Sequence, residues 1–263
     1  MLKLTDNNYF SLEADRDYFS VSQFKSFAEC QAAALAKING EYERPESKAL
    51  IVGSYTHTAF ETEDVFDQFV EDNQKIIFNT RGTKYADFIT ADKMIEAVKK
   101  DRLSMFAMDG EKEVIMNAEL FGVHWKIKVD SINHQRKTFT DLKTTQSLSK
   151  RYWSDKYQKY VSFVEAWDYV LQMAVYREVI YQSTGNYYTP YIVAVTKEDP
   201  PDKAVLHFDE SRFQYELDYV QGLIGHYRNL KQGQGVAWRC ETCVYCRRTK
   251  QLKDTMEIGS LLD

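Results

Sequence analysis

The stretch from Gly122 to Lys143 reads GVHWKIKVDSINHQRKTFTDLK and has the pattern of two strands joined by a turn. Its first half, Val123 to Asp130, alternates apolar with polar side chains, which is typical of a half-buried strand. The polar segment 133–136 suits a hairpin loop, and a second strand is predicted over 137–144. The sequence therefore places a β-hairpin near the middle of the chain.

The charged residues of this predicted hairpin form a candidate cation site. Asp141 and Lys143 share one face of the second strand, and Leu142 points to the other. If the strands are adjacent, Asp130 meets that face. Two carboxylates beside a lysine suit a hard divalent cation and leave an ammonium to steer a water or a phosphate. Taken alone, the triplet fits two solvated strand-end acids and a solvated lysine equally well.

The amino-acid composition and net charge limit the classes of protein to which the chain can belong. The chain has 263 residues, 44% hydrophobic and 28% charged, which is ordinary for a globular protein with a full core. The formal net charge of −5 counts mildly against a binder of nucleic acid, although local charge in a cleft matters more than the sum. The amino terminus has no signal-peptide core, and no stretch of about 18 apolar residues is present. These features predict a cytoplasmic chain without a membrane partner.

The other elements are predicted from helical and strand periodicity. Ser20 and Ser22 cap a first helix that contains Cys30. Further helices are expected at 48–63, 90–108, up to about 182, and 209–231, strands at 113–120, 187–196 and 204–208, and a loop at 73–89. This order predicts one α/β domain over 1–263 with a central mixed β-sheet flanked by helices. Its parts would be an N-terminal helical part (1–110), a catalytic sheet and helix (111–208), and a C-terminal helix with a cysteine-rich tail (209–263).

A basic and aromatic segment follows the predicted hairpin. Residues 144–160 interleave cationic side chains with tyrosines and a tryptophan, a pattern that suits a phosphate backbone and unstacked bases. The cationic side chains in question are Lys150, Arg151, Lys156 and Lys159. The start of an amphipathic helix with a solvated basic face explains the pattern equally well.

Four short motifs stand in a definite order along the chain. They are G-x-x-x-H at Gly53–His57, G-x-x-x-K-x-K-x-D at Gly122–Asp130, D-L-K at Asp141–Lys143, and Q-x-x-x-Y at Gln172–Tyr176. In this order they resemble the RecB-like branch of the PD-(D/E)xK nuclease superfamily, most closely the phage-encoded RecE (exonuclease VIII) group. The resemblance runs from Ser20 to the cysteine-rich tail and implies a restriction-endonuclease-like core.

The resemblance implies roles for individual residues. The metal ligands would be His57, Asp130, Asp141 and the backbone carbonyl of Leu142. Lys143 would hold or activate the attacking water, and Gln172 and Tyr176 would brace the lysine and the DNA backbone. Ser22 would lie near a terminal phosphate. Further DNA contacts are expected from Lys126, Lys128, Lys150, Arg151, Lys156 and Lys159.

The resemblance also implies cofactors, partners and setting. Mg²⁺ or Mn²⁺, two ions per site, would support a 5′-to-3′ exonuclease acting on double-stranded DNA ends. The 3′ overhangs would pass to a RecT-like single-strand annealing protein during phage-type recombination in a bacterial host cell. The enzyme would form a ring-shaped homo-oligomer, a trimer or tetramer. The alternatives are a CRISPR-associated RecB-like single-strand nuclease and a non-catalytic module that binds DNA ends.

The cysteines form a separate candidate site. Cys240, Cys243 and Cys246 make C-x2-C-x2-C, and Cys30 is the only other cysteine. Some RecB-like nucleases hold a [4Fe–4S] cluster with one cysteine before the catalytic motifs and three after them. The sequence leaves three alternatives: a [4Fe–4S] cluster, Zn²⁺, or reduced thiols.

Overall fold

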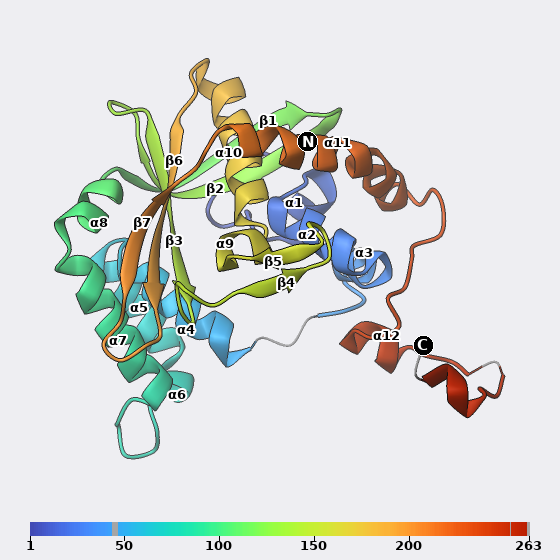
Figure 1. Cartoon of the computed structure of the whole chain (residues 1–263), viewed down its shortest axis with the longest axis horizontal. Helices are drawn as coiled ribbons and strands as arrows, with labels where there is room; N and C mark the ends of the chain where they lie inside the picture. Colours follow the sequence, from blue (N-terminus) through green and yellow to red (C-terminus); the bar gives the residue numbers. More distant parts are fainter. Residues whose placement is uncertain (44–46, 253, 262–263) are drawn as a thin grey trace.

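A five-stranded mixed sheet lies at the centre of the computed structural model, which describes residues 1–43, 47–252 and 254–261 (Figure 1). The strand order is β1 (Glu111–Leu120), β2 (Val123–Asn133), β3 (Thr138–Thr145), β6 (Thr189–Thr196) and β7 (Lys203–His207). Only β3 and β6 run parallel. The predicted fold class, a mixed sheet with flanking helices, is confirmed.

Helices cover both faces of this sheet. In chain order they are α1 (Leu12–Asp17), α2 (Val21–Glu29), α3 (Gln31–Asn39), α4 (Lys48–Thr58), α5 (Glu63–Asp72), α6 (Gln74–Ile77), α7 (Ala86–Lys99), α8 (Arg102–Ala107), α9 (Phe163–Ala166), α10 (Tyr169–Thr184), α11 (Ser211–Lys231) and α12 (Val244–Arg248), with a 3₁₀ turn η1 (Ile258–Leu261). In the part of the chain that the structure describes, no helix is both long and apolar enough to cross a membrane.

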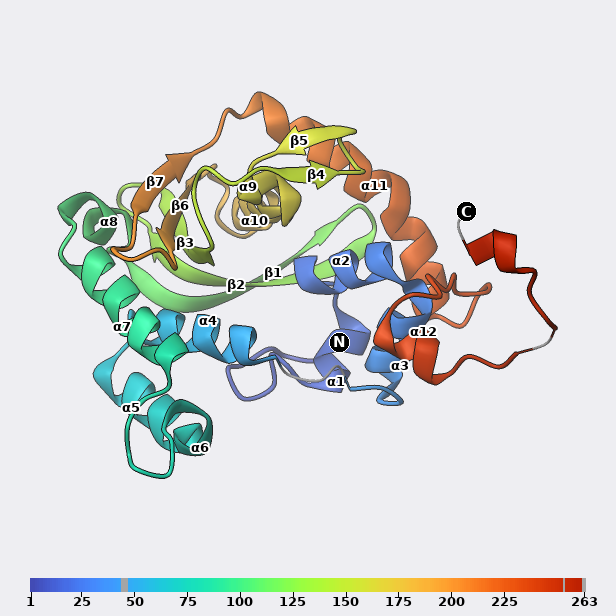
Figure 2. The same ribbon diagram turned by 60° about the horizontal axis from the view of Figure 1, so that its bottom comes forward.

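Two apolar layers sandwich the strands that carry the candidate site. Helix α10 packs on one face, where Phe139 of β3 and Trp125 of β2 join the larger core. Helices α4 and α7 pack on the other face against Leu142 and Val193 (Figure 2). The alternation read from the sequence is therefore correct, because Phe139 and Leu142 point to opposite faces of β3. Burial on both faces fixes the strand register, since a slip of one residue would exchange the two sets of side chains.

Several element predictions are wrong. The single helices expected at 48–63 and 90–108 end at Thr58 and Lys99, and a separate helix, α5 or α8, follows each. The basic and aromatic segment is not a helix but a two-stranded hairpin of β4 (Tyr152–Ser154) and β5 (Lys159–Val161). Cys30 lies not inside a helix but in extended conformation between α2 and α3. The segment 73–89 contains α6 and the start of α7, which begins at Ala86 because the bridge between Phe78 and Lys84 closes the preceding loop.

Candidate active site

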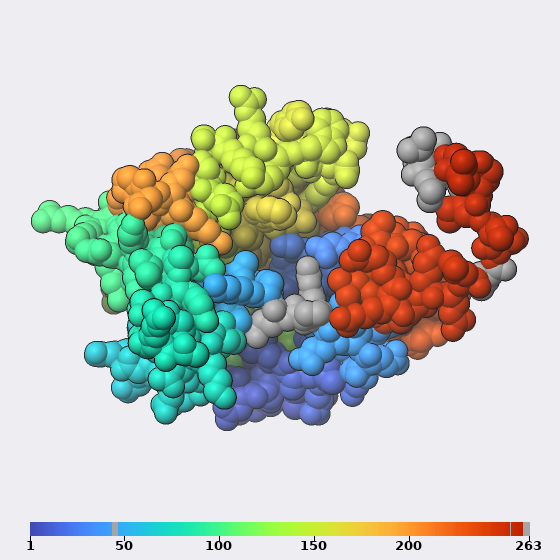
Figure 3. Space-filling model, turned by 90° about the horizontal axis from the view of Figure 1, so that it is seen from below, coloured from blue at the N-terminus to red at the C-terminus, as the bar shows by residue number. Residues whose placement is uncertain are grey.

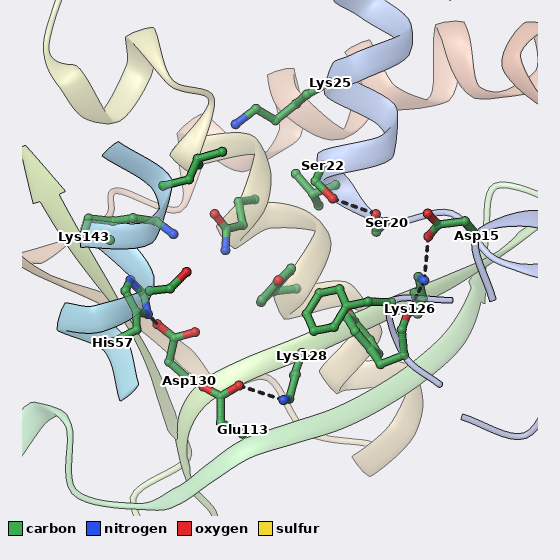
Figure 4. A pocket seen from close by; sticks show the side chains of 18 of the residues that line it. Asp15, Ser20, Ser22, Lys25, His57, Glu113, Lys126, Lys128, Asp130 and Lys143 are labelled. Atoms are coloured by element: carbon green, nitrogen blue, oxygen red, sulfur yellow. Dashed lines mark hydrogen bonds and ion pairs between the residues drawn. The ribbon is translucent and has the colours of Figure 1, made fainter. Parts of the chain in front are cut away.

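The four motifs that are far apart in the sequence meet at one end of the β2–β3 pair. His57 of α4, Asp130 of β2 and Lys143 of β3 point toward one another (Figure 4). Asp141 also comes from β3, and Gln172 comes from α10. The Nδ1 atom of His57 lies 3.2 Å from Oδ2 of Asp130, and Nζ of Lys143 lies 2.6 Å from Oδ2 of Asp141. The structure thus brings together the residues predicted to bind metal and to handle the water.

Diverging strands make room for these side chains. The backbone pairing of β2 with β3 covers only three residue pairs and stops at Ser131–Thr140. At the next position the Leu142 N–H donates to the Asp130 carboxylate at 2.9 Å in place of a ladder bond. This contact holds Asp130 beside the backbone of β3. The role of the Leu142 carbonyl as a ligand stays a prediction.

The pKa values of Asp130 and Asp141 are shifted in opposite directions. For Asp130, burial raises the pKa, but the adjacent His57 outweighs it, so the net pKa lies below the ordinary value. For Asp141, burial and the nearby Asp130 charge raise the pKa above the ordinary value despite the Lys143 ammonium. The two acids therefore differ, as expected when like charges share a buried site.

Neighbouring acids favour the charged forms of both His57 and Lys143. Burial opposes the imidazolium, but Asp130 outweighs it and raises the pKa of His57. Burial also opposes the Lys143 ammonium, whereas Asp141 and Asp130 raise its pKa above the ordinary value. Lys143 further lies over the Tyr169 ring at 4.7 Å. A lysine this firmly protonated is a cation and a donor, and is not a proton acceptor.

Gln172 and Tyr176 occupy one side of α10, but Gln172 braces a different residue from the one expected. Its Nε2 donates to Oδ1 of Asp141 at 2.6 Å rather than contacting Lys143. Tyr176 lines the same cleft and lies against Phe139, and burial raises the pKa of its hydroxyl well above the ordinary value. Gln172 thus positions an acid, while Tyr176 supplies a neutral hydroxyl.

The cluster opens into a cleft of about 1090 Å³. The far wall is the start of α2, where the Ser20 and Ser22 hydroxyls lie 3.0 Å apart and Ser20 caps the helix (Figure 4). Lys25 lines the same wall and donates to the Trp167 carbonyl at 2.6 Å. Ser22 therefore faces the cleft, as its predicted contact requires. The space-filling view shows the surface hollowed near α4 (Figure 3).

Two acids of the cleft were not singled out as ligands from the sequence. Glu113 of β1 and Glu61, just beyond α4, line it, and burial followed by neighbouring acids raises the pKa of each. Lys128, predicted to contact DNA, pairs with Glu113 at 3.0 Å but still lines the cleft. Glu113 gave no sequence signal because it lies outside the four motifs, on a strand expected only to complete the sheet.

Two of the lysines predicted to contact DNA are paired with acids of the protein itself. Lys126 is 2% exposed and donates to Asp15 at 2.7 Å and to the Tyr9 carbonyl at 2.5 Å. Lys156 pairs with Asp168 at 2.8 Å and with the buried Glu216. Exposed side chains remain at Lys150, Arg151 and Lys159.

Lys126→Ala is therefore expected to lower stability rather than DNA affinity. Removing one partner of a buried pair leaves the other without compensation, which costs about 3 kcal/mol here because Asp15 is partly exposed. In a chain of 263 residues that loss lowers Tm by about 6 °C. Thermal unfolding followed by circular dichroism measures it. Lys93→Ala, which breaks an exposed pair with Asp199, is the control and should leave Tm nearly unchanged. Equal Tm values for the two variants would contradict the buried role.

The four cysteines come together away from the cleft. Their Sγ atoms all lie within 4.8 Å of one another, and those of Cys30 and Cys246 are 3.5 Å apart. Backbone N–H groups of Cys243 and Cys246 point at the sulfurs of Cys240 and Cys243. The tail is also tied to α3, where Ala32 N–H donates to the Trp238 carbonyl. A four-thiol site able to hold metal is thus present.

Comparison with known proteins agrees with this site. The model of the PDDEXK-like domain of unknown function (DUF3799) matches residues 20–249. A crystal structure from Eubacterium rectale, named "Putative exonuclease", is 36% identical, with a TM-score of 0.93 over 99% of this chain and 98% of that chain. A structure named SSO0001 covers 77% of this chain and 84% of its own at 15% identity and a TM-score of 0.27, too low to carry an argument. No curated protein matches the chain.

The matched region contains the charged cluster and the serine wall of the cleft, from the cap of α2 to the last cysteine, but not the residues before Ser20 that also line the cleft. The family match and the shared fold of the 36% identical structure agree with each other and with the geometry. The chain therefore belongs to the family of PDDEXK-like domains DUF3799, within the PD-(D/E)xK nuclease superfamily.

Proposed function

We propose that the protein is a metal-dependent nuclease that hydrolyses DNA in the cleft beside Asp130 and Asp141. One observation carries this: two carboxylates with oppositely shifted pKa values, a lysine and a histidine converge at a cleft of about 1090 Å³, which is above the usual size of a small-molecule pocket. The exonuclease named among the structural matches supports the same chemistry.

The donor set fits a hard divalent cation. Asp141 is 3% exposed, and its Oδ2 accepts no hydrogen bond among the described residues although Lys143 lies 2.6 Å away as an ion pair. The buried oxygen thus keeps lone-pair capacity for a cation. Asp130, Asp141, His57 and the Leu142 carbonyl would hold Mg²⁺ or Mn²⁺, and Glu113 and Glu61 would add charge for a second ion. Such ions supply a nucleophilic water and neutralise charge on the phosphate.

The protein's own groups orient and stabilise the reacting atoms. Lys143, fixed by Asp141 and by the Tyr169 ring, would donate to the phosphate or orient the attacking water. Gln172 donates to Oδ1 of Asp141 and Lys143 pairs with Oδ2, so the two side chains together fix the orientation of this carboxylate. Ser20, Ser22 and Lys25 on the opposite wall would hold a neighbouring phosphate of the same strand.

The finer proposal is a 5′-to-3′ exonuclease of the RecE type that leaves 3′ overhangs for a RecT-like annealing protein. Support comes from the four-motif resemblance and from the serine and lysine wall, which suits a terminal phosphate. With a net charge of −5, the protein has little long-range electrostatic attraction for DNA. A ring-shaped trimer or tetramer that encloses the DNA would retain it instead.

One digestion series tests both levels of the proposal. Linear duplex, closed circular duplex and single-stranded DNA are incubated with Mg²⁺, and linear duplex carries a label at either end. Degradation of linear duplex with early loss of 5′ label is expected, together with a trimer or tetramer mass in light scattering. Absence of hydrolysis on every substrate would refute the nuclease. Early loss of 3′ label would refute only the polarity, and a monomeric mass only the ring.

A CRISPR-associated RecB-like single-strand nuclease is the second candidate. The observation that favours it is that Cys30 and the three tail cysteines, the one-plus-three set on which that resemblance rests, come together in space. Hydrolysis confined to single strands in the same digestion series would select this function.

For the cysteine site itself we propose a single tetrahedral ion such as Zn²⁺. A Zn–S bond of about 2.3 Å places tetrahedral sulfurs about 3.8 Å apart, within the 4.8 Å limit seen for all four. In an iron–sulfur cluster the thiolates bind different irons and must stand further apart. The ion would clasp the tail to the junction of α2 and α3, behind the wall that carries Ser22.

Protein purified without oxygen is expected to contain about one zinc per chain and to be colourless. Elemental analysis and the absorbance near 400 nm measure this. Cys30→Ser should release the ion and lower Tm, whereas Ser26→Ala, in α2 shortly before Cys30 but outside the thiol group, should keep the zinc content. A brown protein with stoichiometric iron would overturn the zinc assignment in favour of a cluster.

A further inference from the structure

The β4–β5 hairpin exposes aromatic side chains that the fold itself does not use. Trp153 and Tyr160 are directly opposite each other in the strand pairing, with ring centroids 5.5 Å apart in edge contact. Trp153 is 54% exposed and Tyr160 is 66% exposed. A cross-strand aromatic pair stabilises a hairpin, and its exposed ring surface remains available for contact with a ligand. We call this exposed pair the aromatic face.

The hairpin is held too firmly for this exposure to result from a loose loop. On its inner side Tyr157 and Lys156 both bond the buried Glu216 of α11, and Tyr152 packs against Trp167 at 5.5 Å. On its outer side the Trp153 indole N–H donates to Asp155 at 2.8 Å, which fixes the orientation of the ring. The aromatic face is therefore preorganised, and little rotamer entropy is lost when it meets a ligand.

Charge around the aromatic face is predominantly positive. Lys150, Arg151 and Lys159 are exposed on or beside the two strands, whereas Lys156 is neutralised by Glu216. Asp155 is the only acid between positions 148 and 161. Flat aromatic rings bordered by cations complement a ligand that combines flat rings with regularly spaced anions. Single-stranded nucleic acid has this chemistry, and duplex does not offer its base faces.

The hairpin also adjoins the cleft. Strand β3, which carries Asp141 and Lys143, ends at Thr145, seven residues before the hairpin begins. Lys25 of the cleft wall bonds the carbonyl of Trp167, whose ring contacts Tyr152 at the base of the hairpin. In the space-filling view the yellow-green segment that contains β4 and β5 forms one border of the hollowed region (Figure 3). A strand that leaves the cleft past Lys25 would reach the aromatic face.

We propose that the aromatic face of the β4–β5 hairpin is a stacking platform for the bases of unpaired DNA at the cleft mouth. Trp153 and Tyr160 would each stack on a base, and Lys150, Arg151 and Lys159 would contact the phosphates between them. This proposal rests on the nuclease function proposed above and adds to it a subsite outside the catalytic cluster. The hairpin would thus keep separated strands apart while one of them is cut.

The test uses the full chain without divalent ions, so that binding is measured without cleavage. A fluorescein-labelled 15-nucleotide oligothymidine and a blunt 15-base-pair duplex are titrated by anisotropy. Trp153→Ala/Tyr160→Ala is expected to weaken oligothymidine binding at least tenfold, since each stacked base contributes that order of affinity. Duplex binding should change less than threefold. Trp153→Leu, which keeps an apolar side chain without a ring, should lose several-fold, whereas Trp153→Phe should recover most of the affinity.

Phe106→Ala is the matched control, because Phe106 is 59% exposed on the remote helix α8 and should leave both affinities unchanged. Equal oligothymidine affinity for wild type, the double variant and Trp153→Leu, in a wild type that still hydrolyses DNA with Mg²⁺, would overturn the platform and leave the nuclease intact. A wild type that neither binds nor hydrolyses any DNA would overturn both. Single variants remain informative if the double variant fails to fold.

Discussion

Lys143→Ala is expected to slow DNA hydrolysis by about three orders of magnitude while DNA binding is retained, because it removes a preorganised cation at the reacting phosphate. In the structure this ammonium is fixed by Asp141 at 2.6 Å and by the Tyr169 ring, so no other described side chain stands in its place. Single-turnover rates with saturating enzyme separate the chemical step from binding. Binding should persist because the cleft keeps Lys25 and Lys128.

The pH dependence of this variant gives an independent readout. The Lys143 cation lowers the pKa of Asp141, which burial and Asp130 otherwise raise. Removing the cation therefore raises that pKa further, and Asp141 takes up its proton at a higher pH. The ionised carboxylate is required to hold a cation, so the residual activity should begin to fall at a higher pH than that of wild type as the solution is acidified.

Lys143→Arg and Lys93→Ala are the controls for this prediction. Arginine keeps the charge but its planar fork does not fit the short contact with Asp141, so only partial activity is expected. Lys93 lies in an exposed pair and its loss should leave the rate unchanged. A Lys143→Ala enzyme within a few-fold of wild type, with an unmoved acid limb, would show that the lysine serves the fold and not the reaction.

The centre of the site could be predicted from the sequence because it is built by a local hairpin. Asp130 and Asp141 stand one step beyond the last pair, Ser131–Thr140, so the turn between the strands already sets them opposite each other. Strand alternation then fixes which residues share the face. Only eleven positions separate the two acids, and no distant contact is needed to bring them close.

The burial and pairing of Lys126 and Lys156 could not be predicted, because the acids that pair with these lysines lie far away in the sequence. Lys126 alternates with apolar residues as a surface lysine would, but Asp15, 111 positions earlier, buries it. The sequence predicts a DNA contact for Lys156, but in the structure Glu216, 60 positions later, pairs with this lysine. The break at Cys30 likewise depends on the tail, which bonds Ala32 through the Trp238 carbonyl. Periodicity carries no information on such pairs.

Asp130→Asn is expected to weaken Mg²⁺ binding by roughly 100-fold and to stop hydrolysis at millimolar Mg²⁺, because it replaces a charged first ligand by a neutral one. The fold should survive, since asparagine can still accept the Leu142 N–H bond that Asp130 accepts now. Activity should partly return at high Mn²⁺, which binds nitrogen and oxygen ligands more strongly than Mg²⁺ does.

His57→Ala should have a smaller effect, and the comparison tests the assignment. The imidazole is neutral when it acts as a ligand, so its loss removes a bond but no negative charge. Asp130 raises the pKa of His57, so at a pH where the ring is protonated a cation must displace that proton as it binds. Binding of Mg²⁺ to wild type should therefore release a proton that the His57→Ala variant does not release. Calorimetry in two buffers of different ionisation enthalpy measures this, with the exposed His226→Ala as the control. Equal Mg²⁺ affinity and equal proton release in wild type, Asp130→Asn and His57→Ala would exclude both residues as ligands.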